Sequence, residues 1–119
     1  MRFPDVAVNR RGVQAEEQAL QFLLSQGLQF QERNYICRLG EIDLILRDGR
    51  TLVFVEVRMR SSSSFGGAAE SITLRKRARL LAAARHYLAG KRATPPCRFD
   101  AVLIEGDGAP KWIKDAFGE

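Results

Sequence analysis

The sequence predicts an α/β fold, in which helices flank a central mixed β-sheet and the elements follow the order α-β-β-β-α-β. Three observations predict it: an apolar stripe with helical spacing near the N-terminus, two apolar runs joined by a tight-turn dipeptide, and a basic helical segment followed by a last strand. With 119 residues, of which 45% are hydrophobic, we expect one domain over residues 1–119 with one core.

The first helix is expected over residues 13–27, where Gly27 suits a helix C-cap. Its apolar residues recur at helical spacing. They are Ala15, Ala19, Leu20, Leu23 and Leu24. Residues 28–39 then predict an irregular strand that leads into a hairpin.

The hairpin is expected over residues 41–58, because two apolar runs flank Asp48-Gly49, a dipeptide that favours a two-residue turn. Taking these two residues as the loop gives a register that can be counted. The facing pairs are then Arg47 and Arg50, Ile45 and Leu52, Asp43 and Phe54, and Glu41 and Glu56.

One face of this hairpin carries charge. Strand alternation places Glu41, Asp43, Glu56 and Arg58 on the same face, opposite a uniformly apolar face. Asp43 and Glu56 become diagonal neighbours, about 7–8 Å apart at the backbone. They repel each other unless a divalent cation, a basic side chain or a shared proton lies between them. The alternative is that these acids lie at the open end of the hairpin and meet solvent or nearby arginines.

The apolar content of both faces argues against that alternative. Ile45, Leu52 and Phe54 share the face of the acids, so we expect the hairpin to be a central pair of strands covered on both sides. Two carboxylates in such a place suit a hard cation such as Mg²⁺, which commonly takes one or two carboxylates together with phosphate oxygens.

The second half of the chain predicts a helix and two terminal elements. Ser71 or Thr73 could cap a helix that ends at Ala89, and Pro95-Pro96 then forces an extended entry into a strand over residues 98–104. The inner stripe of the helix is expected at Leu74, Ala78, Leu81, Arg85 and Leu88. Trp112, Ile113 and Phe117 are expected to pack the C-terminus onto the body.

Charge is distributed unevenly along the chain, whose formal net charge is +5. The segment from Ser71 to Phe99 contains eight basic and no acidic residues. A helix of one sign indicates a polyanionic partner, and nucleic acid is favoured. The alternatives are an ordinary solvated helix face and a domain that binds an acidic protein.

The expected compartment is the cytoplasm, without membrane attachment. Cys37 and Cys97 are isolated and lack metal-ligand spacing, which fits a reducing environment. No apolar run approaches the ~20 residues that span a bilayer, and Met1–Arg11 lacks the apolar core of a signal peptide.

Five blocks, in this order, carry a family resemblance over nearly the whole chain. They are Ala15-Glu16-Glu17-Gln18-Ala19, residues 40–45 (GEIDLI), residues 53–58 (VFVEVR), residues 98–102 (RFDAV) and residues 112–117 (WIKDAF). With these blocks the chain closely resembles the YraN family of small bacterial proteins. The resemblance implies a restriction-endonuclease-like fold, similar to that of archaeal Holliday junction resolvases, and a nuclease-like activity whose biological role is unsettled.

The resemblance also implies residue roles through the PD-(D/E)XK pattern. Asp43 matches the first acid, Glu56 the second, Arg58 the lysine position and Glu17 the helical glutamate, so Asp43, Glu56 and Glu17 are the expected ligands of Mg²⁺ or Mn²⁺. Glu41 would support them, and the DNA backbone would be positioned by Arg60, Arg75, Lys76 and Arg79. Glu16 stands where the resemblance leads us to expect glycine.

Two function classes therefore stay open. One is a metal-dependent endonuclease that hydrolyses phosphodiesters, with DNA favoured and branched DNA among the candidate substrates. The other is a nucleic-acid-binding module that keeps the fold without the chemistry, since Arg58 stays protonated and is a poor general base. A junction-cleaving enzyme would act as a homodimer, of which the sequence carries no clear mark. Asp100 is expected to be a structural partner of a nearby arginine.

Overall fold

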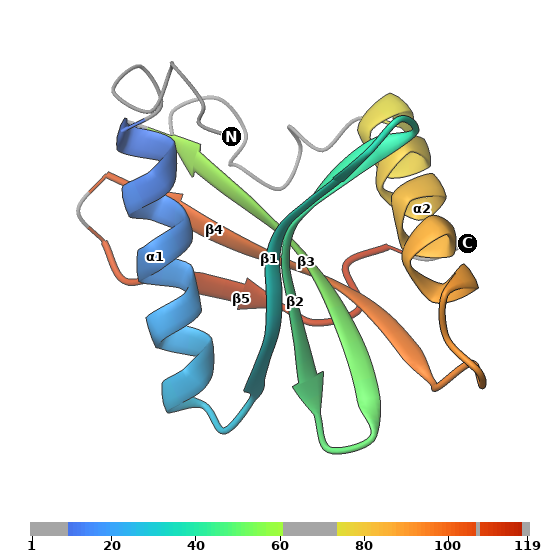
Figure 1. The fold of residues 1–119 in the computed structure, drawn as a ribbon. Coiled ribbons are helices and arrows are strands. Elements are labelled where there is room, and N and C mark those ends of the chain that lie inside the picture. Colours follow the sequence, from blue (N-terminus) through green and yellow to red (C-terminus); the bar gives the residue numbers. More distant parts are fainter. Residues whose placement is uncertain (1–9, 61–73, 107, 118–119) are drawn as a thin grey trace.

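A computed structural model describes residues 10–60, 74–106 and 108–117, except for the side chains of residues 10–12 and 60. Seven elements follow one another along the chain (Figure 1). They are α1 (Arg10–Ser25), β1 (Gln29–Cys37), β2 (Gly40–Asp48), β3 (Thr51–Arg60), α2 (Leu74–Ala89), β4 (Cys97–Glu105) and β5 (Lys111–Ile113). The predicted order of elements is confirmed, and β5 is an additional strand.

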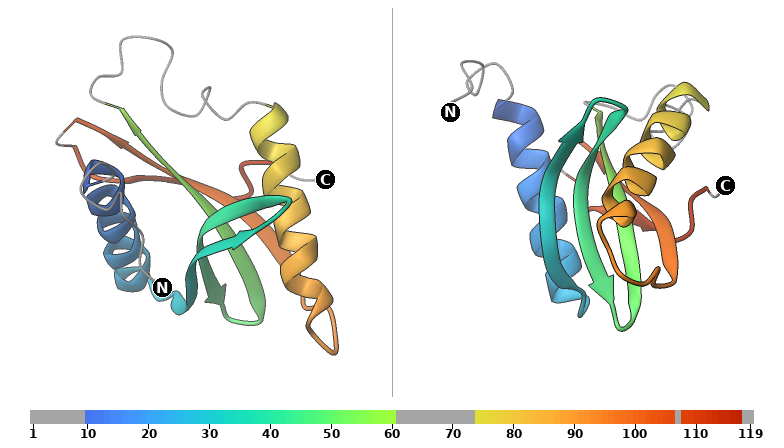
Figure 2. Two further views of the ribbon diagram at one scale, coloured as in Figure 1. Left: turned by 45° about the horizontal axis from the view of Figure 1, so that its top comes forward. Right: turned by 45° about the vertical axis from the view of Figure 1, so that its right-hand side comes forward.

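The strands form one mixed sheet in the order β1-β2-β3-β4-β5. All neighbouring pairs are antiparallel except β3 and β4, which run parallel. The chain passes from β3 to β4 through α2, which lies on the face of the sheet opposite to α1 (Figure 2). The β2–β3 hairpin therefore lies inside the sheet, as its two apolar faces predict.

Alternation along the hairpin divides its apolar side chains between two clusters. Leu44, Leu46, Val53 and Val55 join the cluster that contains the α1 residues. The side chains on the other face join the cluster that contains the α2 residues. They are Ile45, Leu52 and Phe54. The predicted assignment of faces is thus correct over the paired part of the hairpin.

The C-terminus of α1 confirms the predicted glycine cap. Gly27 has φ 98°, the left-handed region that favours glycine. Its N–H donates to the carbonyl of Leu24 at 3.0 Å, and the N–H of Leu28 donates to the carbonyl of Leu23 at 3.2 Å. This pair of bonds is the Schellman motif, and Leu23 and Leu28 supply the apolar contact that accompanies it.

The register of the β2–β3 hairpin differs from the predicted one. The closing pair is Asp48 and Thr51, so the loop is Gly49–Arg50 and not Asp48–Gly49. Of the two loop residues, only Gly49 has a positive φ, at 64°. A turn with glycine at its first central position requires this conformation. The shift preserves parity, so the faces are unchanged, but every residue meets a partner two positions further along β3 than predicted.

The inner stripe expected for α2 is confirmed only in part, since Leu81 and Leu88 pack against the α2-side cluster. The buried residues of α2 are Leu80, Ala83 and Ala84, whereas Leu74 is 80% exposed. The small side chains of Ala83 and Ala84 let the helix approach the sheet closely. The predicted stripe did not include these two alanines. Ser71 and Thr73, the expected caps, lie outside the described residues.

The C-terminal segment packs onto the body as predicted, with Phe117 in the α2-side cluster, and a fully buried Asp100 anchors it. Arg98 donates to Asp100 from Nε and Nη2, each at 2.9 Å. The Trp112 indole and the Asp115 backbone N–H donate at the same distance. Asp100 therefore has the structural role expected of it. No helix in the described ranges is long and apolar enough to cross a membrane.

Candidate carboxylate site at the fork of the sheet

The sheet divides near the start of β2, where the β1–β2 hairpin bends toward α2 and leaves β3 (Figures 1 and 2). Pairing of β2 with β3 extends to Leu44 and Val55. Beyond that pair, Ile42 belongs to the α2-side cluster, although its parity would place it with Leu44. The bend therefore rotates the first residues of β2 toward α2 and opens a fork between β2 and β3.

Glycine at the tip of the β1–β2 hairpin allows this bend. A Cβ on Gly40 would lie 3.0 Å from the carbonyl carbon of Arg79 and closer still to its oxygen. Such separations do not occur in packed structures. The backbone of β2 thus rests directly on the backbone of α2, which fixes the helix beside the fork.

Asp43 lies at the base of the fork. It comes one residue before Leu44, where the pairing of β2 with β3 ends. Its Oδ2 accepts a hydrogen bond of 2.8 Å from the backbone N–H of Val57. Burial raises the pKa of Asp43 well above its usual value, and the charges of Glu56 and Glu16 raise this pKa further. The fold thus holds this acid among other acids.

Glu56 lies between two cations. Arg58 donates from Nη1 to Oε2 of Glu56 at 3.4 Å, and Nζ of Lys76 on α2 lies 3.6 Å from the same oxygen. The Glu56 side chain is only 14% exposed. Basic side chains therefore neutralise part of the acid pair, one of the three possibilities that the sequence left open.

A cavity of about 250 Å³ opens beside this pair of strands. Its walls come from the start of β2, from β3 and from the first half of α2. The lining residues are Glu41, Glu56, Lys76, Arg79 and Leu80. Carboxylates thus face cations across the space between the sheet and the helix.

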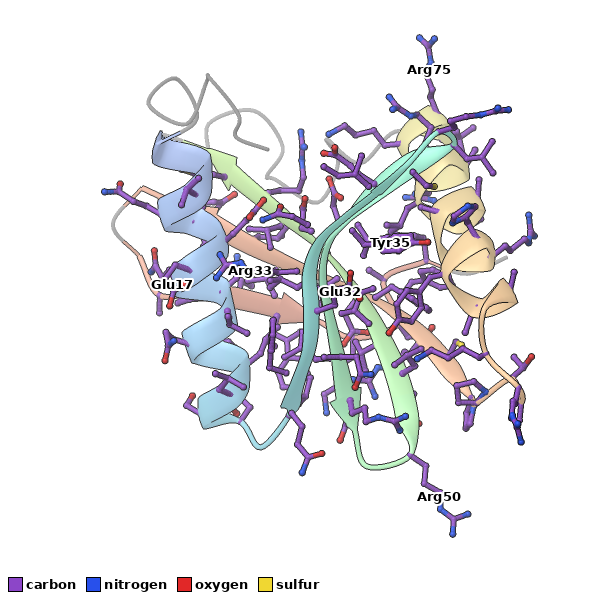
Figure 3. All side chains as sticks on the ribbon, in the orientation of Figure 1. Glu17, Glu32, Arg33, Tyr35, Arg50 and Arg75 are labelled. Carbon is purple, nitrogen blue, oxygen red and sulfur yellow. The ribbon has the colours of Figure 1, made fainter. Side chains whose placement is uncertain are left out.

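The structure brings Glu16, and not Glu17, to the acid pair. Burial raises the pKa of Glu16, opposed by a hydrogen bond from Asn34 and by Arg33, while the charges of Glu41 and Glu56 raise this pKa further. Glu17 is exposed, and the Arg33 hydrogen bond at 2.9 Å lowers its pKa. Figure 3 shows Arg33 reaching from β1 to α1, where Glu17 lies.

Helical phase could have identified Glu16. It precedes Ala19, Leu20 and Leu23 by three, four and seven positions, the spacing of one helix face, and all three are buried. Glu17 is one position out of phase with this stripe. The expected family glycine drew attention to Glu16 without suggesting that it reaches the site.

Among the predicted nucleic-acid contacts, Lys76 and Arg79 line the cavity. Arg75 extends from the same end of α2 away from the body of the molecule (Figure 3). Arg60 ends β3, and its side chain lies outside the described part. The one-signed helix thus presents cations beside the carboxylates.

The two carboxylates suit a hard divalent cation, but they do not provide a complete set of protein ligands. Asp43 and Glu56 offer carboxylate oxygens, and their mutual repulsion would be relieved by a cation between them. In the described part of the chain, no three His, Cys, Asp or Glu side chains converge on one metal position. Two carboxylates with phosphate oxygens and waters would complete a Mg²⁺ shell, so the set fits an ion shared with substrate and does not form a closed protein site.

Sequence comparison gives the family of the chain. The profile described as "Uncharacterised protein family UPF0102" matches residues 15–104. A UPF0102 protein of Nitrosomonas europaea is 56% identical over 95% of this chain and 98% of its own. Another, of Cupriavidus taiwanensis, is 57% identical over 90% of this chain and 82% of its own. The chain belongs to the uncharacterised protein family UPF0102, which is the YraN family that its motifs resemble.

Proposed function

We propose that this protein is a metal-dependent nuclease that hydrolyses phosphodiesters of nucleic acid, with DNA favoured. The observation that carries the proposal is the position of Asp43 at the fork, bonded to the backbone N–H next to Glu56, beside a cavity whose other wall is the basic helix α2. The buried carboxyl group of Asp43, whose pKa is raised by burial and by neighbouring acids, costs free energy when the chain folds. Binding of a cation and a phosphate at this site would explain why the acids are placed together.

The residues divide into two groups by what they would contact. Asp43 and Glu56 would hold Mg²⁺ or Mn²⁺, and Glu16 and Glu41 would add negative potential around it. Lys76 and Arg79 face the same cavity and would contact phosphate oxygens, with Arg75 on the approach to it. When bound, a divalent cation polarises the phosphoryl oxygens and lowers the pKa of coordinated water.

The proposed reaction is an in-line displacement. The oxygen of a water molecule forms a bond to phosphorus, the bond from phosphorus to one ester oxygen breaks, and that oxygen leaves with the electron pair. The water loses one proton and the leaving alkoxide gains one, so the products are a phosphate monoester and an alcohol. Arg58, which stays protonated, stabilises the developing negative charge and takes no proton.

The test is cleavage by purified protein in Mg²⁺ or Mn²⁺, using plasmid, single-stranded, flapped and four-way-junction DNA. Glu56→Gln is the first variant, because the amide keeps the shape of the side chain and removes the charge. We expect loss of cleavage by at least 100-fold. No cleavage of any substrate by the native protein, or equal cleavage by the variant, would refute the nuclease function.

A second candidate is a nucleic-acid-binding module without catalysis. The specific observation in its favour is that Lys76 and Arg58 already contact the Glu56 carboxylate, so the acid has a structural role in the absence of metal. This function predicts salt-dependent DNA binding that Mn²⁺ does not alter and that Glu56→Gln leaves intact or strengthens.

A further inference from the structure

A lysine reaches the site from a position that the family motif does not mark. The motif position on β3 is Arg58, but Nζ of Lys76 lies 3.6 Å from Oε2 of Glu56. Arg58 approaches the same oxygen at 3.4 Å. The two cations come from different elements, since Arg58 lies two residues along the strand from Glu56 and Lys76 comes from the opposite wall of the cavity.

The two cations differ in what they can do next. Lys76 lines the cavity and its side chain is 46% exposed, whereas the Arg58 side chain is 27% exposed. A lysine is a compact charge on a flexible stem, and an arginine is a planar fork that stays charged. Because the backbone of α2 is held against Gly40, a change of partner by Lys76 would have to come from its side chain and not from movement of the helix.

A divalent cation at Glu56 would compete directly with these contacts. Oε2 of Glu56 already faces two positive charges, and a metal ion bound to it would repel both at short range. The more exposed and more flexible cation is the one that would move. Since Lys76 lines the cavity, its ammonium group would stay near the space where a bound nucleic acid would place a phosphate.

We propose that Lys76 is the catalytic lysine of this site, which pairs with Glu56 in the metal-free protein and contacts the scissile phosphate when a divalent cation binds. The proposal rests on the proposed nuclease function and deepens it. It assigns to Lys76 the compact positive charge that Arg58 cannot supply from the motif position. Because coupling between two ligands is reciprocal, metal and nucleic acid would strengthen each other's binding through this side chain.

The first measurement is calorimetric titration of the full chain with Mn²⁺ alone. Removal of a competing cation should strengthen binding, so Lys76→Met should bind Mn²⁺ about 2- to 5-fold more tightly than the native protein, the range expected for loss of one exposed ion pair. Lys91→Met is the matched control, because Lys91 lies over the ring of Tyr87 beyond the end of α2. It should leave the Mn²⁺ affinity unchanged.

The second measurement is single-turnover cleavage of DNA at saturating Mn²⁺. Lys76→Met should lower the rate at least 10-fold despite its tighter Mn²⁺ binding, and Lys76→Arg should keep the native Mn²⁺ affinity yet cleave more slowly. Unchanged or weaker Mn²⁺ binding by Lys76→Met, or native cleavage by it, overturns the proposal. If the native protein cleaves nothing, the nuclease function fails with the phosphate role, while the Mn²⁺ titration separately decides whether Lys76 competes with the cation.

Discussion

Gly40→Ala tests the contact that joins the hairpin to α2. The new Cβ would lie 3.0 Å from the carbonyl carbon and 3.2 Å from Cβ of Arg79. Ordinary contacts begin at 3.4 Å and the carbonyl oxygen of Arg79 would lie closer still than these two atoms, so backbone must separate from backbone. Small-to-large changes in packed regions cost about 1–3 kcal/mol, and we expect a loss of this size in the free energy of unfolding.

Urea unfolding followed by far-ultraviolet circular dichroism measures the loss. With a slope of about 2 kcal/mol per M urea, the midpoint should fall by about 0.5–1.5 M. Gly90→Ala is the control, because its nearest neighbour would be an ordinary 3.8 Å from the added Cβ. It should change stability by less than about 1 kcal/mol. An unchanged midpoint for Gly40→Ala would refute the account of how α2 is fixed beside the fork.

Three further predictions concern the carboxylates. Asp100→Ala leaves the donors of Arg98 and Trp112 without their buried acceptor, and should cost about 3–5 kcal/mol in urea unfolding; a loss below 1 kcal/mol would contradict this role. Burial raises the pKa of Asp43 in the folded state, so the unfolding free energy should fall as pH rises from about 4 through that raised value. Asp43→Asn should reduce this dependence of the unfolding free energy on pH, measured in a pH series. The same dependence in the variant would show that Asp43 does not cause it. Glu16→Gln should weaken Mn²⁺ binding measured by calorimetry, because it removes negative potential from the site, whereas Glu17→Gln should not; equal effects would show that neither distance nor burial distinguishes the two.

The faces of the hairpin could be predicted because they depend only on parity. The predicted loop was wrong by one residue, and that error moved the pairing by two, an even number. Ile45 therefore still faces α2 and Leu44 still faces α1. The choice of loop depended on Asp48-Gly49, a dipeptide with two favourable residues, whereas the observed turn needs positive φ only at Gly49. Periodicity is robust to such an error, and the distance between two acids is not.

Helix faces were harder to predict than strand faces. In α2 the expected stripe included Leu81 and Leu88, which pack against the core, but missed the residues that are most buried, Leu80, Ala83 and Ala84. An alanine has little side-chain area to indicate burial, so its place is decided by how closely the helix approaches the sheet. Helical phase was also overlooked in α1, where Glu16 lies in phase with the buried stripe but was considered only as a departure from the glycine that the family resemblance leads us to expect.

The fork itself depends on contacts between distant parts of the chain. Where β2 leaves β3, the N–H of Val57 is satisfied by the Asp43 carboxylate, so Asp43 stabilises the fork as well as carrying charge. Its presence there is consequently explained by the fold alone. Glu56, Glu41 and Glu16 have no such explanation from this backbone group, and their gathering around Asp43 raises the cost of the arrangement. It is this second set of acids, together with Lys76 on the facing helix, that the proposed cation chemistry at the fork would use.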